Sequence, residues 1–445
     1  MLLRLPASPA RSLLKKMIAA GLAAADPYQT LLGTVSLKRS TLRIGHRAYD
    51  LTRFDRVLVV GAGKASARMA QAFERILGTR LERGLVIVKT GHTLPLKRIR
   101  IREAGHPIPD RAGQQAAQQL LKLVKPLTCR DLLFVLLSGG ASSLLPAPVP
   151  GITLTDKQRT TRLLLRSGAT INEINIVRKH LSLIKGGGLA ASTQATIVTL
   201  ILSDVIGDDL GSIGSGPTTA DPSTFADAID VLRRYEIWHA VPTPVRHYLQ
   251  KGQKGTVPET LKPGSSRTRS VSHQIIGNNR LMIRAVAHTA KSMGLRTTLL
   301  STAITGEAQS TAKTLAGLAR SRSSRQGSIP RPCCIIAGGE TTVTVTGQGK
   351  GGRAQEFAVA AALEIAGLPN TWVAALGTDG TDGPTDVAGA VVSGDTVTCA
   401  QRQRINLPAA LTQNNTYPAL KRLGCHIYTG PTGTNVNDLY LLLLL

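Results

Sequence analysis

The sequence is poor in aromatic residues, in cysteine pairs and in long apolar runs, and each shortage argues against a class of protein. Aromatic residues make up 3% of the 445 residues, so the cores must consist of Leu, Ile, Val and Ala, which favours helices packed on parallel sheets over an all-β sandwich. The five cysteines include no Cys-x-x-Cys pair, which argues against a disulfide framework or a zinc site. No apolar run reaches the about 20 residues of a membrane-spanning helix. We therefore expect a cytoplasmic protein that does not enter a membrane.

Acidic residues are also scarce. The chain has 54 Lys and Arg against 27 Asp and Glu, a formal net charge of +27. Such a charge attracts nucleic acid non-specifically, but the positive residues are scattered and are not interleaved with aromatic residues as in a stacking platform. We interpret the charge mostly as solvated surface, and keep a basic nucleic-acid-binding protein as an alternative function.

The first half of the chain repeats one pattern of short apolar strand, Gly-rich turn and helix. Four such strands are predicted at Val57–Val60, Leu85–Val88, Asp131–Leu137 and Thr196–Leu202. This rhythm predicts a doubly wound α/β domain, which binds ligands at the carboxyl ends of its strands. Before it, apolar residues at helical spacing within residues 13–22 predict an amphipathic first helix rather than a transit peptide.

The second half predicts another α/β unit. Its strands are expected at Cys334–Ala337, Thr341–Thr346, Val373–Leu376 and Leu439–Leu445, with a helix near Ala354–Ala366, and two further strands, Val271–Ile276 and Leu295–Leu300, are expected in the segment that precedes it. The alternation of Thr341, Val343 and Val345 predicts an antiparallel strand and hence a mixed sheet. The expected fold is two three-layer α/β/α domains, the first Rossmann-like with a mainly parallel sheet and the second with a mixed sheet. The expected domains are residues 1–250, a connecting segment 251–330 with strands and a basic loop at Arg320–Arg331, and residues 331–445.

A glycine-bent turn, Gly61-x-Gly63-Lys64-x-Ser66, follows the first predicted strand. Amide groups at the start of a helix hold anions, and Lys64 adds a positive charge. The spacing is not that of a P-loop, and the third glycine of the dinucleotide fingerprint is missing. We predict a phosphate contact at Gly61, Gly63, Lys64 and Ser66, the alternative being a tight turn with an exposed lysine.

Two further loops follow strands of the first half. The amides of Ser138, Gly139 and Gly140 could cradle an anion or simply form a turn; a serine nucleophile is the rival interpretation, but Gly-x-Ser-x-Gly is absent. Asp204, directly after its strand, is a candidate to bind Mg²⁺ or to accept a proton from a substrate hydroxyl. His106 lies in a proline-bound loop and is either functional or part of a structural turn.

The second half carries the opposite charge balance, with seven acidic and two basic residues between positions 335 and 400. Arg353 follows a Gly-rich loop and is a candidate to stabilise charge on a transferring phosphoryl group; otherwise it is a surface residue at the end of a hairpin. Asp379, Asp382 and Asp386 are spaced for Mg²⁺, the alternative being Gly-Asp turns without metal. Asn278 could bind a nucleotide or cap a helix, and Glu340 completes the predicted binding residues.

Together these segments resemble the two-domain glycerate 2-kinases, whose C-terminal part is the MOFRL domain. The resemblance rests on VGAGKAS, GHPIPD, LLSGGASSLLPAP, INEINIVRKHLSLIKGGGLA, LILSDVIGDDLGSIGSGPT, GGETTVTVTGQGKGGRAQE, LGTDGTDGPTDVAGA and GPTGTNVNDL, which run from about residue 10 to the C-terminus. It implies ATP-dependent phosphorylation of D-glycerate to 2-phosphoglycerate with Mg²⁺, an active site in the cleft between the two domains, and functional roles for Lys64 and Arg353.

The expected partners are therefore D-glycerate and ATP, with no specific nucleic acid and no membrane, while monomer and homodimer both stay open. Hydroxypyruvate reductase is the alternative enzyme, because relatives of the family have carried that label. The missing dinucleotide fingerprint argues against it.

Overall fold

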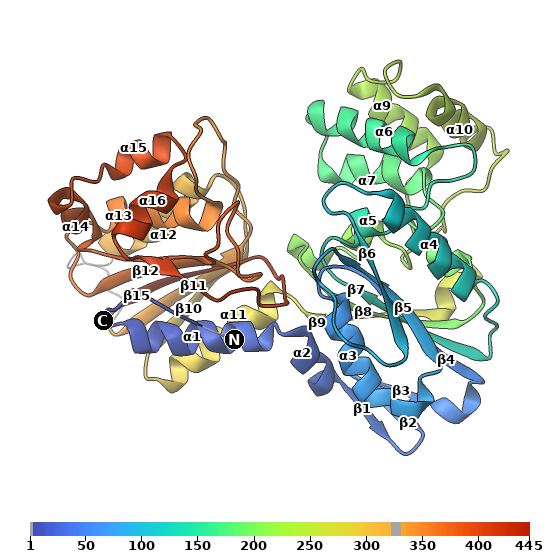
Figure 1. Cartoon of the computed structure of the whole chain (residues 1–445), viewed down its shortest axis with the longest axis horizontal. Coiled ribbons are helices and arrows are strands. Elements are labelled where there is room, and N and C mark those ends of the chain that lie inside the picture. Colours follow the sequence, from blue (N-terminus) through green and yellow to red (C-terminus); the bar gives the residue numbers. More distant parts are fainter. Residues whose placement is uncertain (1–2, 322–330) are drawn as a thin grey trace. The chain divides into compact units, whose positions relative to one another are not determined.

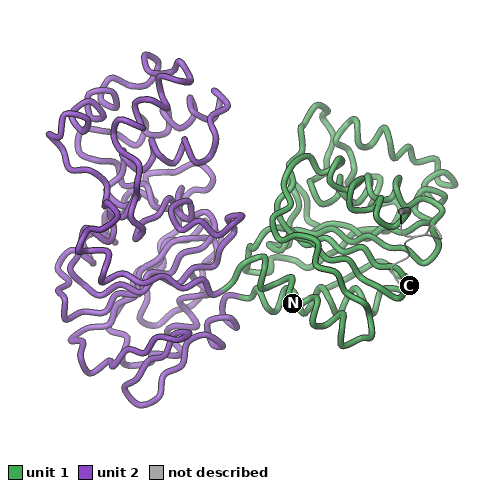
Figure 2. The backbone as a smooth tube through the Cα atoms, turned by 180° about the vertical axis from the view of Figure 1, so that it is seen from behind, with its two compact units in different colours: residues 1–26, 277–445 green, residues 27–276 purple. Residues whose placement is uncertain are grey.

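The computed structural model describes residues 3–321 and 331–445, and the chain divides into two compact units (Figure 2). Unit 2 is Pro27–Ile276, and unit 1 combines Met1–Asp26 with Gly277–Leu445. Residues 322–330, the greater part of the basic loop predicted at 320–331, lie outside the described residues. Unit 2 is thus one continuous stretch of chain, whereas unit 1 is assembled from two.

Unit 2 is built on a six-stranded sheet in the order β6-β5-β4-β7-β8-β9. Its strands are β4 (Arg56–Ala62), β5 (Arg83–Lys89), β6 (Ile99–Ala104), β7 (Asp131–Leu137), β8 (Thr196–Leu202) and β9 (Val271–Gly277). The pairs from β6 to β8 are all parallel, which confirms the predicted Rossmann-like sheet. The continuous apolar runs of β7 and β8 reflect burial on both faces. The sequence analysis missed β6, whose alternating charges suit an edge strand.

Helices cover both faces of this sheet (Figure 1), among them α3 (Ser66–Leu77) and α4 (Arg111–Val124). The other helices of unit 2 are α2 (Pro27–Thr34), α5 (Ala141–Leu144), α6 (Leu154–Arg166), α7 (Ile171–His180), α8 (Gly188–Ala191), α9 (Phe225–Arg234) and α10 (Thr243–Gln253). Helices α6, α7, α9 and α10 share a separate apolar cluster that includes Leu164, Val177 and Leu232. A small antiparallel sheet of β1 (Val35–Lys38), β2 (Thr41–Ile44) and β3 (Arg47–Asp50) completes the unit.

Unit 1 contains a mixed sheet in the order β10-β11-β15-β12-β13-β14. Its strands are β10 (Arg296–Ile304), β11 (Cys333–Gly339), β12 (Thr371–Gly377), β13 (Gly389–Ser393), β14 (His426–Ile427) and β15 (Asp438–Leu444). Only the β10–β11 pair is parallel. The mixed sheet is confirmed, and the apolar run predicted as a last strand lies at its centre, between β11 and β12.

The strand predicted at Thr341–Thr346 does not form, which corrects the argument for the mixed sheet. Thr342 makes one isolated bridge with Glu307, and the amides of Thr346 and Gly347 donate to the side chain of Asn414, each at 2.9 Å. The alternation of Thr and Val is present, but the backbone amides there donate to the side chain of Asn414 instead of to a neighbouring strand. The antiparallel pairs are instead those of β15 with β11 and β12, of β12 with β13, and of β13 with β14.

The predicted first helix is confirmed as α1 (Arg11–Ala24), and it belongs to unit 1. It packs against α11 (Asn279–Ser292), which covers the same sheet face in Figure 1. Gly21 permits the contact, because a Cβ there would lie 2.7 Å from Cγ2 of Val286. The opposite face carries α12 (Ala308–Ser321) and α13 (Arg353–Glu364), with α14 (Thr396–Arg402), α15 (Leu407–Thr412) and α16 (Thr416–Arg422) nearby. None of the described helices combines the length and the apolar composition that a membrane span needs.

Candidate functional site

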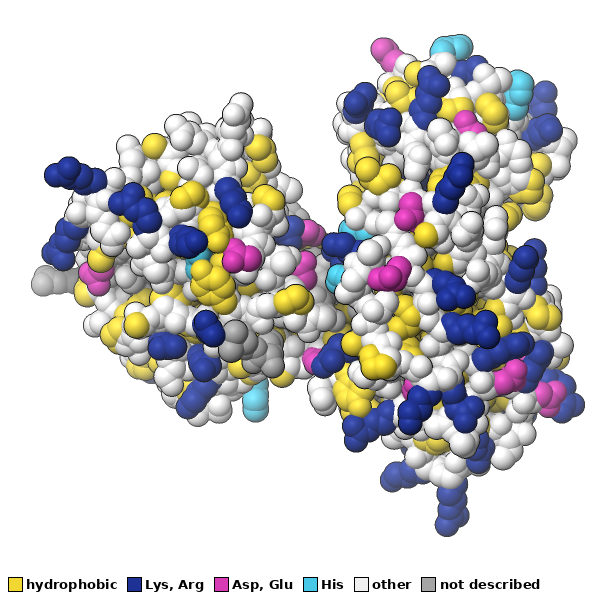
Figure 3. Space-filling model, viewed as in Figure 1, with side chains coloured by type: hydrophobic (Ala, Val, Ile, Leu, Met, Phe, Trp, Pro, Cys, Tyr) yellow, Lys and Arg dark blue, Asp and Glu magenta, His cyan; other side chains and the backbone are white. Residues whose placement is uncertain are grey.

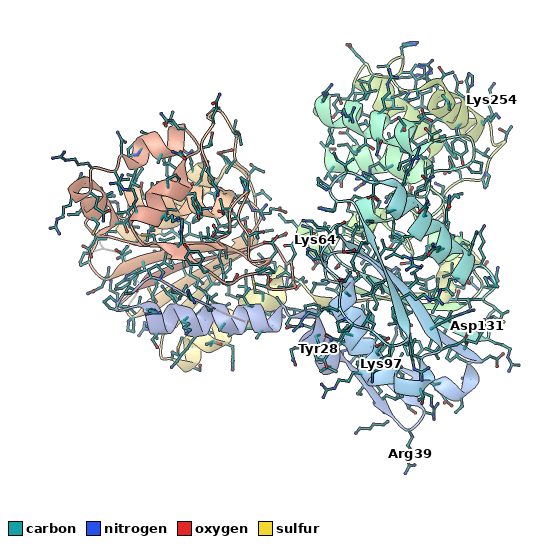
Figure 4. All side chains as sticks on the ribbon, viewed as in Figure 1. Tyr28, Arg39, Lys64, Lys97, Asp131 and Lys254 are labelled. Atoms are coloured by element: carbon teal, nitrogen blue, oxygen red, sulfur yellow. The ribbon has the colours of Figure 1, made fainter. Side chains whose placement is uncertain are left out.

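The turn after β4 and the loop after β7 are joined by main-chain and hydroxyl contacts. The amide of Lys64 donates to the carbonyl oxygen of Gly139 at 2.9 Å, and the amide of Ala65 donates to Oγ of Ser138 at 3.0 Å. Because β4 and β7 are parallel neighbours, both turns lie at their carboxyl ends. Figure 4 labels Lys64 at this end and Asp131 at the other. Lys64 and the Ser138–Gly140 loop therefore lie together, while the predicted phosphate contact stays a prediction.

The predicted glycines of this turn serve close packing. A Cβ at Gly61 would lie 2.3 Å from the carbonyl oxygen of Leu136, and one at Gly63 would lie 2.1 Å from Oγ of Ser138. Gly63 also has a φ of +140°, which glycine adopts most easily. Ser66 is fully buried, and its hydroxyl donates to the carbonyl oxygen of Leu136 at 3.2 Å. These three residues let the two turns approach each other.

Two polar side chains face the glycines of the second turn. A Cβ at Gly139 would lie 2.0 Å from Oδ2 of Asp204, and one at Gly140 would lie 3.0 Å from Nε2 of His106. The structure thus brings the predicted residues Asp204, Gly139 and Gly140 together, with His106 beside them. Glycine is required at position 139 so that a carboxylate can lie against the main chain.

Lys64 contributes a positive charge at this edge of the sheet. Its side chain is partly exposed, and no described group accepts a hydrogen bond from its ammonium or forms an ion pair with it. Burial, followed by the charges of Lys64 and Lys89 and by His92, lowers the pKa of His106 to about 4. His106 is therefore neutral near pH 7, so that Lys64 is the cation and His106 is a neutral hydrogen-bonding group.

Arg353, at the start of α13, is held by two carboxylates of unit 1. Its Nε donates to Oδ2 of Asp438 at 2.8 Å and its Nη2 to Oδ1 of Asp438 at 3.0 Å, while Nη1 donates to Oε1 of Glu340 at 2.5 Å. Burial lowers the pKa of Arg353, but Asp438 and Glu340 outweigh it and raise that pKa above its ordinary value. The guanidinium of Arg353 is therefore held by two carboxylates, whereas the ammonium of Lys64 has no such partner among the described residues.

The sequence analysis missed Asp438 as a site residue. This aspartate begins β15 and is fully buried; Tyr440 donates its hydroxyl to Oδ2 at 3.0 Å. Burial raises the pKa of Asp438 to about 7, and Arg353 opposes the rise. The sequence signal that could have revealed it is an aspartate directly before the apolar run that was predicted as a strand. A buried carboxylate at that position requires a cationic partner.

Asp382 serves as a helix cap for α13. Its Oδ1 accepts from the amide of Ala354 at 3.0 Å, and its Oδ2 accepts from the amide and from Nε2 of Gln355, each at 2.9 Å. Burial raises the pKa of Asp382, and these hydrogen bonds oppose the rise. Both carboxylate oxygens are therefore used at the start of the helix, which also places Arg353.

The other two predicted metal ligands also have protein partners. Oδ1 of Asp379 accepts from the amide of Thr381 at 3.0 Å and from its hydroxyl at 3.1 Å. Oδ1 of Asp386 accepts from the hydroxyl of Tyr417 at 2.7 Å. Across residues 3–321 and 331–445, no group of three or more His, Cys, Asp and Glu side chains could hold a metal ion. The three aspartates therefore do not form a metal site of their own, and their arrangement is that of the Gly-Asp turns named as the alternative.

Asn278 is the N-cap of α11, where its Oδ1 accepts from the amide of Leu281 at 2.9 Å. This is the second of the two roles considered for it. Its neighbour Asn279 donates from Nδ2 to the carbonyl oxygen of Asp438 at 3.0 Å, so this asparagine pair supports the segment that carries Asp438.

Lys and Arg side chains lie over both units on the face drawn in Figure 3. One hollow of unit 2, beside β5 and β6, is lined by one acid, Glu82, and by six cations: Arg83, Lys97, Arg98, Arg100, Arg102 and Lys122. No aromatic residue lines it. The hollow therefore lacks the stacking groups of a single-strand platform.

Comparison with known proteins places the chain among two-part proteins of the same organisation. Residues 13–250 match a family described as a domain of unknown function, DUF4147, and residues 333–438 match the MOFRL family. The chain is 40% identical over 425 residues to the glycerate 2-kinase of Pyrococcus horikoshii, covering 95% of each chain.

The same organisation is found in a solved structure, the glycerate kinase of Thermotoga maritima, which is 36% identical and has a TM-score of 0.87; the match covers 98% of this chain and 99% of that one. A protein of Agrobacterium vitis that carries the name hydroxypyruvate reductase is 39% identical over 438 residues, covering 98% of this chain and 94% of the relative. The likeness therefore extends over both units.

Proposed function

Because the chain belongs to the glycerate 2-kinase family, we propose that it transfers the terminal phosphoryl group of ATP to the 2-hydroxyl of D-glycerate and so forms 2-phosphoglycerate and ADP. The observation that carries this proposal is the 40% identity over 95% of both chains to a protein of that name. The unpaired ammonium of Lys64 at the ligand-binding edge of the sheet supports it, since phosphoryl transfer requires cations and amides aimed at anionic oxygens.

In this reaction a bond forms between the 2-oxygen of glycerate and the terminal phosphorus, and the bond from that phosphorus to the bridging oxygen of ADP breaks. The hydroxyl proton must leave as the new bond forms. We assign its acceptance to Asp204, which lies against Gly139. Lys64 offsets the negative charge of the phosphoryl oxygens, and Arg353 is proposed as the second cation on the basis of the family resemblance.

Mg²⁺ is expected for a kinase of this class, and a kinase ordinarily binds it through one or two carboxylates together with the phosphates of ATP. The predicted set of Asp379, Asp382 and Asp386 does not fit a metal site held by protein alone, because Asp382 caps α13 with both oxygens and Asp386 is bonded to Tyr417. No step of the proposed reaction is therefore assigned to a metal held by these three aspartates.

A coupled assay tests the function. Purified protein with ATP, Mg²⁺ and D-glycerate should release ADP only when glycerate is present, and the product should be 2-phosphoglycerate rather than 3-phosphoglycerate. Oxidation of NADH by hydroxypyruvate without ATP would replace the proposal with the reductase. Tight duplex binding in a gel-shift titration at physiological salt, without use of ATP, would favour the nucleic-acid alternative.

A further inference from the structure

Unit 2 contains a cluster of three cations that the proposed reaction has not used. Lys157 lies on α6, Arg178 on α7, and Lys185 follows α7. Nη2 of Arg178 donates to Oγ of Ser142 at 2.6 Å, and Nζ of Lys185 donates to the carbonyl oxygen and to Oγ of Ser142 at 2.7 and 3.1 Å. Arg178 and Lys185 therefore both contact Ser142, which follows the loop whose residues contact Lys64 and Asp204, and Lys157 lies near enough to Arg178 to feel its charge.

The hydroxyl of Ser142 has no donor left for a ligand. Ser215 lies 2.7 Å away and donates its own proton to Oδ1 of Asn175 at 3.0 Å. Ser142 must therefore donate to Ser215, and its lone pairs accept from Arg178 and Lys185. Ser142 holds two of the cations in position, so that a ligand would be held by the cations themselves.

The cluster has no counter-charge among the described residues. No carboxylate there forms an ion pair with Lys157, Arg178 or Lys185, whereas the neighbouring Lys179 is paired with Asp221 at 3.2 Å. Lys157 is only 8% exposed, and its Nζ has no hydrogen-bond partner in the part of the chain that the structure describes. A buried ammonium without a partner is costly, and this one lies close to two further cations.

We propose that Lys157, Arg178 and Lys185 bind the carboxylate of a small 2-hydroxy acid, which under the proposed function is the acceptor D-glycerate. The guanidinium of Arg178 offers the two-donor fork that suits a carboxylate. The assignment of this anion to the acceptor rests on the proposed function.

The position of the cluster also favours a short acid. Ser142 is three residues after Gly139, whose main chain lies against Asp204, so an acid bound by its carboxylate near Ser142 needs its hydroxyl close to that carboxylate if the hydroxyl is to reach the proposed proton acceptor. Burial and Arg178 lower the pKa of Lys157 to about 7, and burial with Arg178 and Lys157 lowers that of Lys185 well below its ordinary value. The cluster thus carries less than its formal charge near neutral pH, which suits a monoanion better than a phosphate chain.

The experiment is a calorimetric titration of D-glycerate into the full chain without nucleotide, at pH 8 and in two buffers of different ionisation enthalpy. The variants are Lys157→Met and Arg178→Met, with Arg159→Met as the matched control, since Arg159 is an exposed cation on the same helix. We expect glycerate to bind at least about tenfold more weakly to each cluster variant, since hydrogen bonds from charged groups are the strong ones. Binding to the control should be unchanged.

Two further readouts separate this role from a structural one. Wild-type protein should take up protons when glycerate binds at pH 8, because the anion raises the pKa of Lys157, and Lys157→Met should lose that uptake. Arg178→Lys keeps the charge but not the fork, so its affinity should lie between those of wild type and Arg178→Met. Melting curves show whether each variant is folded, and Lys157→Met is expected to fold because it removes an unpaired buried charge.

The proposal is overturned if glycerate binds both cluster variants as tightly as wild type. It is also overturned if the cluster variants weaken ADP or inorganic phosphate and leave glycerate unchanged, or if neither D-glycerate nor D-lactate binds the wild type. Binding of these acids that depends on the cluster, together with no phosphoryl transfer, would support the carboxylate site and reject only the proposed kinase activity.

Discussion

The carboxylate of Asp438 accepts two parallel hydrogen bonds from the guanidinium of Arg353, at 2.8 and 3.0 Å. Asp438 is itself held by the hydroxyl of Tyr440 at 3.0 Å, and this hydroxyl lies 3.0 Å from that of Thr341. The direction of Arg353 is therefore set by the buried end of β15 before any ligand arrives. Such pre-organisation lowers the cost of ordering a cation when it is needed.

Asp438→Asn should test this relationship. The amide keeps the shape of the carboxylate but removes its charge and turns a donor toward the guanidinium. We expect kcat to fall by roughly ten- to a hundredfold, because Arg353 loses its fixed direction. Asp395→Asn, at an exposed acid of the same unit, is the control. Unchanged kcat in Asp438→Asn would mean that the pair serves stability alone.

Lys64→Met should separate function from stability. We expect kcat to fall by about a hundredfold or more, because an ammonium aimed at developing charge is lost. The melting temperature should change little, because the ammonium has no partner among the described residues. Lys122→Met removes an exposed lysine on α4 and should leave both quantities unchanged.

The same variant has a readout that does not depend on activity. The charge of Lys64 is one cause of the lowered pKa of His106, so in Lys64→Met that pKa should rise from about 4 while burial keeps it below its ordinary value. An NMR titration of the His106 ring measures the rise. A constant pKa would mean that Lys64 does not lie beside His106 in solution.

Gly139→Ala should displace Asp204. The added Cβ would lie 2.0 Å from Oδ2 of Asp204, closer than any real contact, so the carboxylate must move. We expect kcat to fall at least about tenfold, because a proton acceptor must lie within hydrogen-bond reach of its hydroxyl. The control is Gly33→Ala, where the new Cβ has nothing within 4 Å. Normal turnover in Gly139→Ala would remove Asp204 from the proposed reaction.

Lys157→Met should stabilise the ligand-free protein. The pKa of Lys157 is lowered to about 7 in the folded chain from an unfolded value of 10.5. Between these two pH values the unfolded chain holds more protons, so wild-type stability rises with pH across the window.

The variant removes that rise and should be more stable than wild type at pH 7, by an amount on the order of 1 kcal/mol or more, visible as a higher melting temperature. Melting curves at pH 7 and pH 9.5 measure both effects, and Arg159→Met supplies the comparison. A wild type and a Lys157→Met protein with identical pH profiles would contradict the buried, unpaired state of the ammonium.

Asp382→Asn should distinguish a helix cap from a metal ligand. Asparagine at position 382 keeps one acceptor oxygen and turns an NH₂ toward a donor, whereas alanine removes both acceptors and leaves buried donors unpaired, at about 1–3 kcal/mol each. We therefore expect a loss of stability in Asp382→Asn, a larger one in Asp382→Ala, and an unchanged Mg²⁺ requirement in both. A strongly raised Mg²⁺ requirement in Asp382→Asn, with normal stability, would restore the metal assignment.

The sequence predicted most of the framework because β4, β7, β8 and β12 are short apolar runs that lead into turns of small or polar residues, and a strand buried on both faces has that composition. It missed β6 because an edge strand carries charges, and it wrongly assigned a strand to Thr341–Thr346 because the side chain of Asn414 satisfies the backbone there. Local pattern does not reveal a partner some seventy residues away.

The candidate site shows the same division. The turn at Lys64 and the Ser138–Gly140 loop were predicted to lie together because both follow strands of one parallel sheet. The contacts of each aspartate could not be predicted from the sequence. Asp382 caps a helix and Asp438 forms an ion pair, and the residue type alone does not distinguish the two roles. The cluster of Lys157, Arg178 and Lys185 was also missed, because its members are joined by helix packing and by contacts with Ser142.

The position of β15 between β11 and β12 affects the order in which the two units can fold during synthesis. Unit 2 is continuous from Pro27 to Ile276 and has all of its strands once β9 exists, whereas unit 1 needs α1, which precedes unit 2 in the chain, and β15, which follows every other strand. During synthesis unit 2 is free to fold while β11 and β12 still lack the strand that joins them. The exposed edges of β11 and β12 are then the part of the nascent chain most open to aggregation.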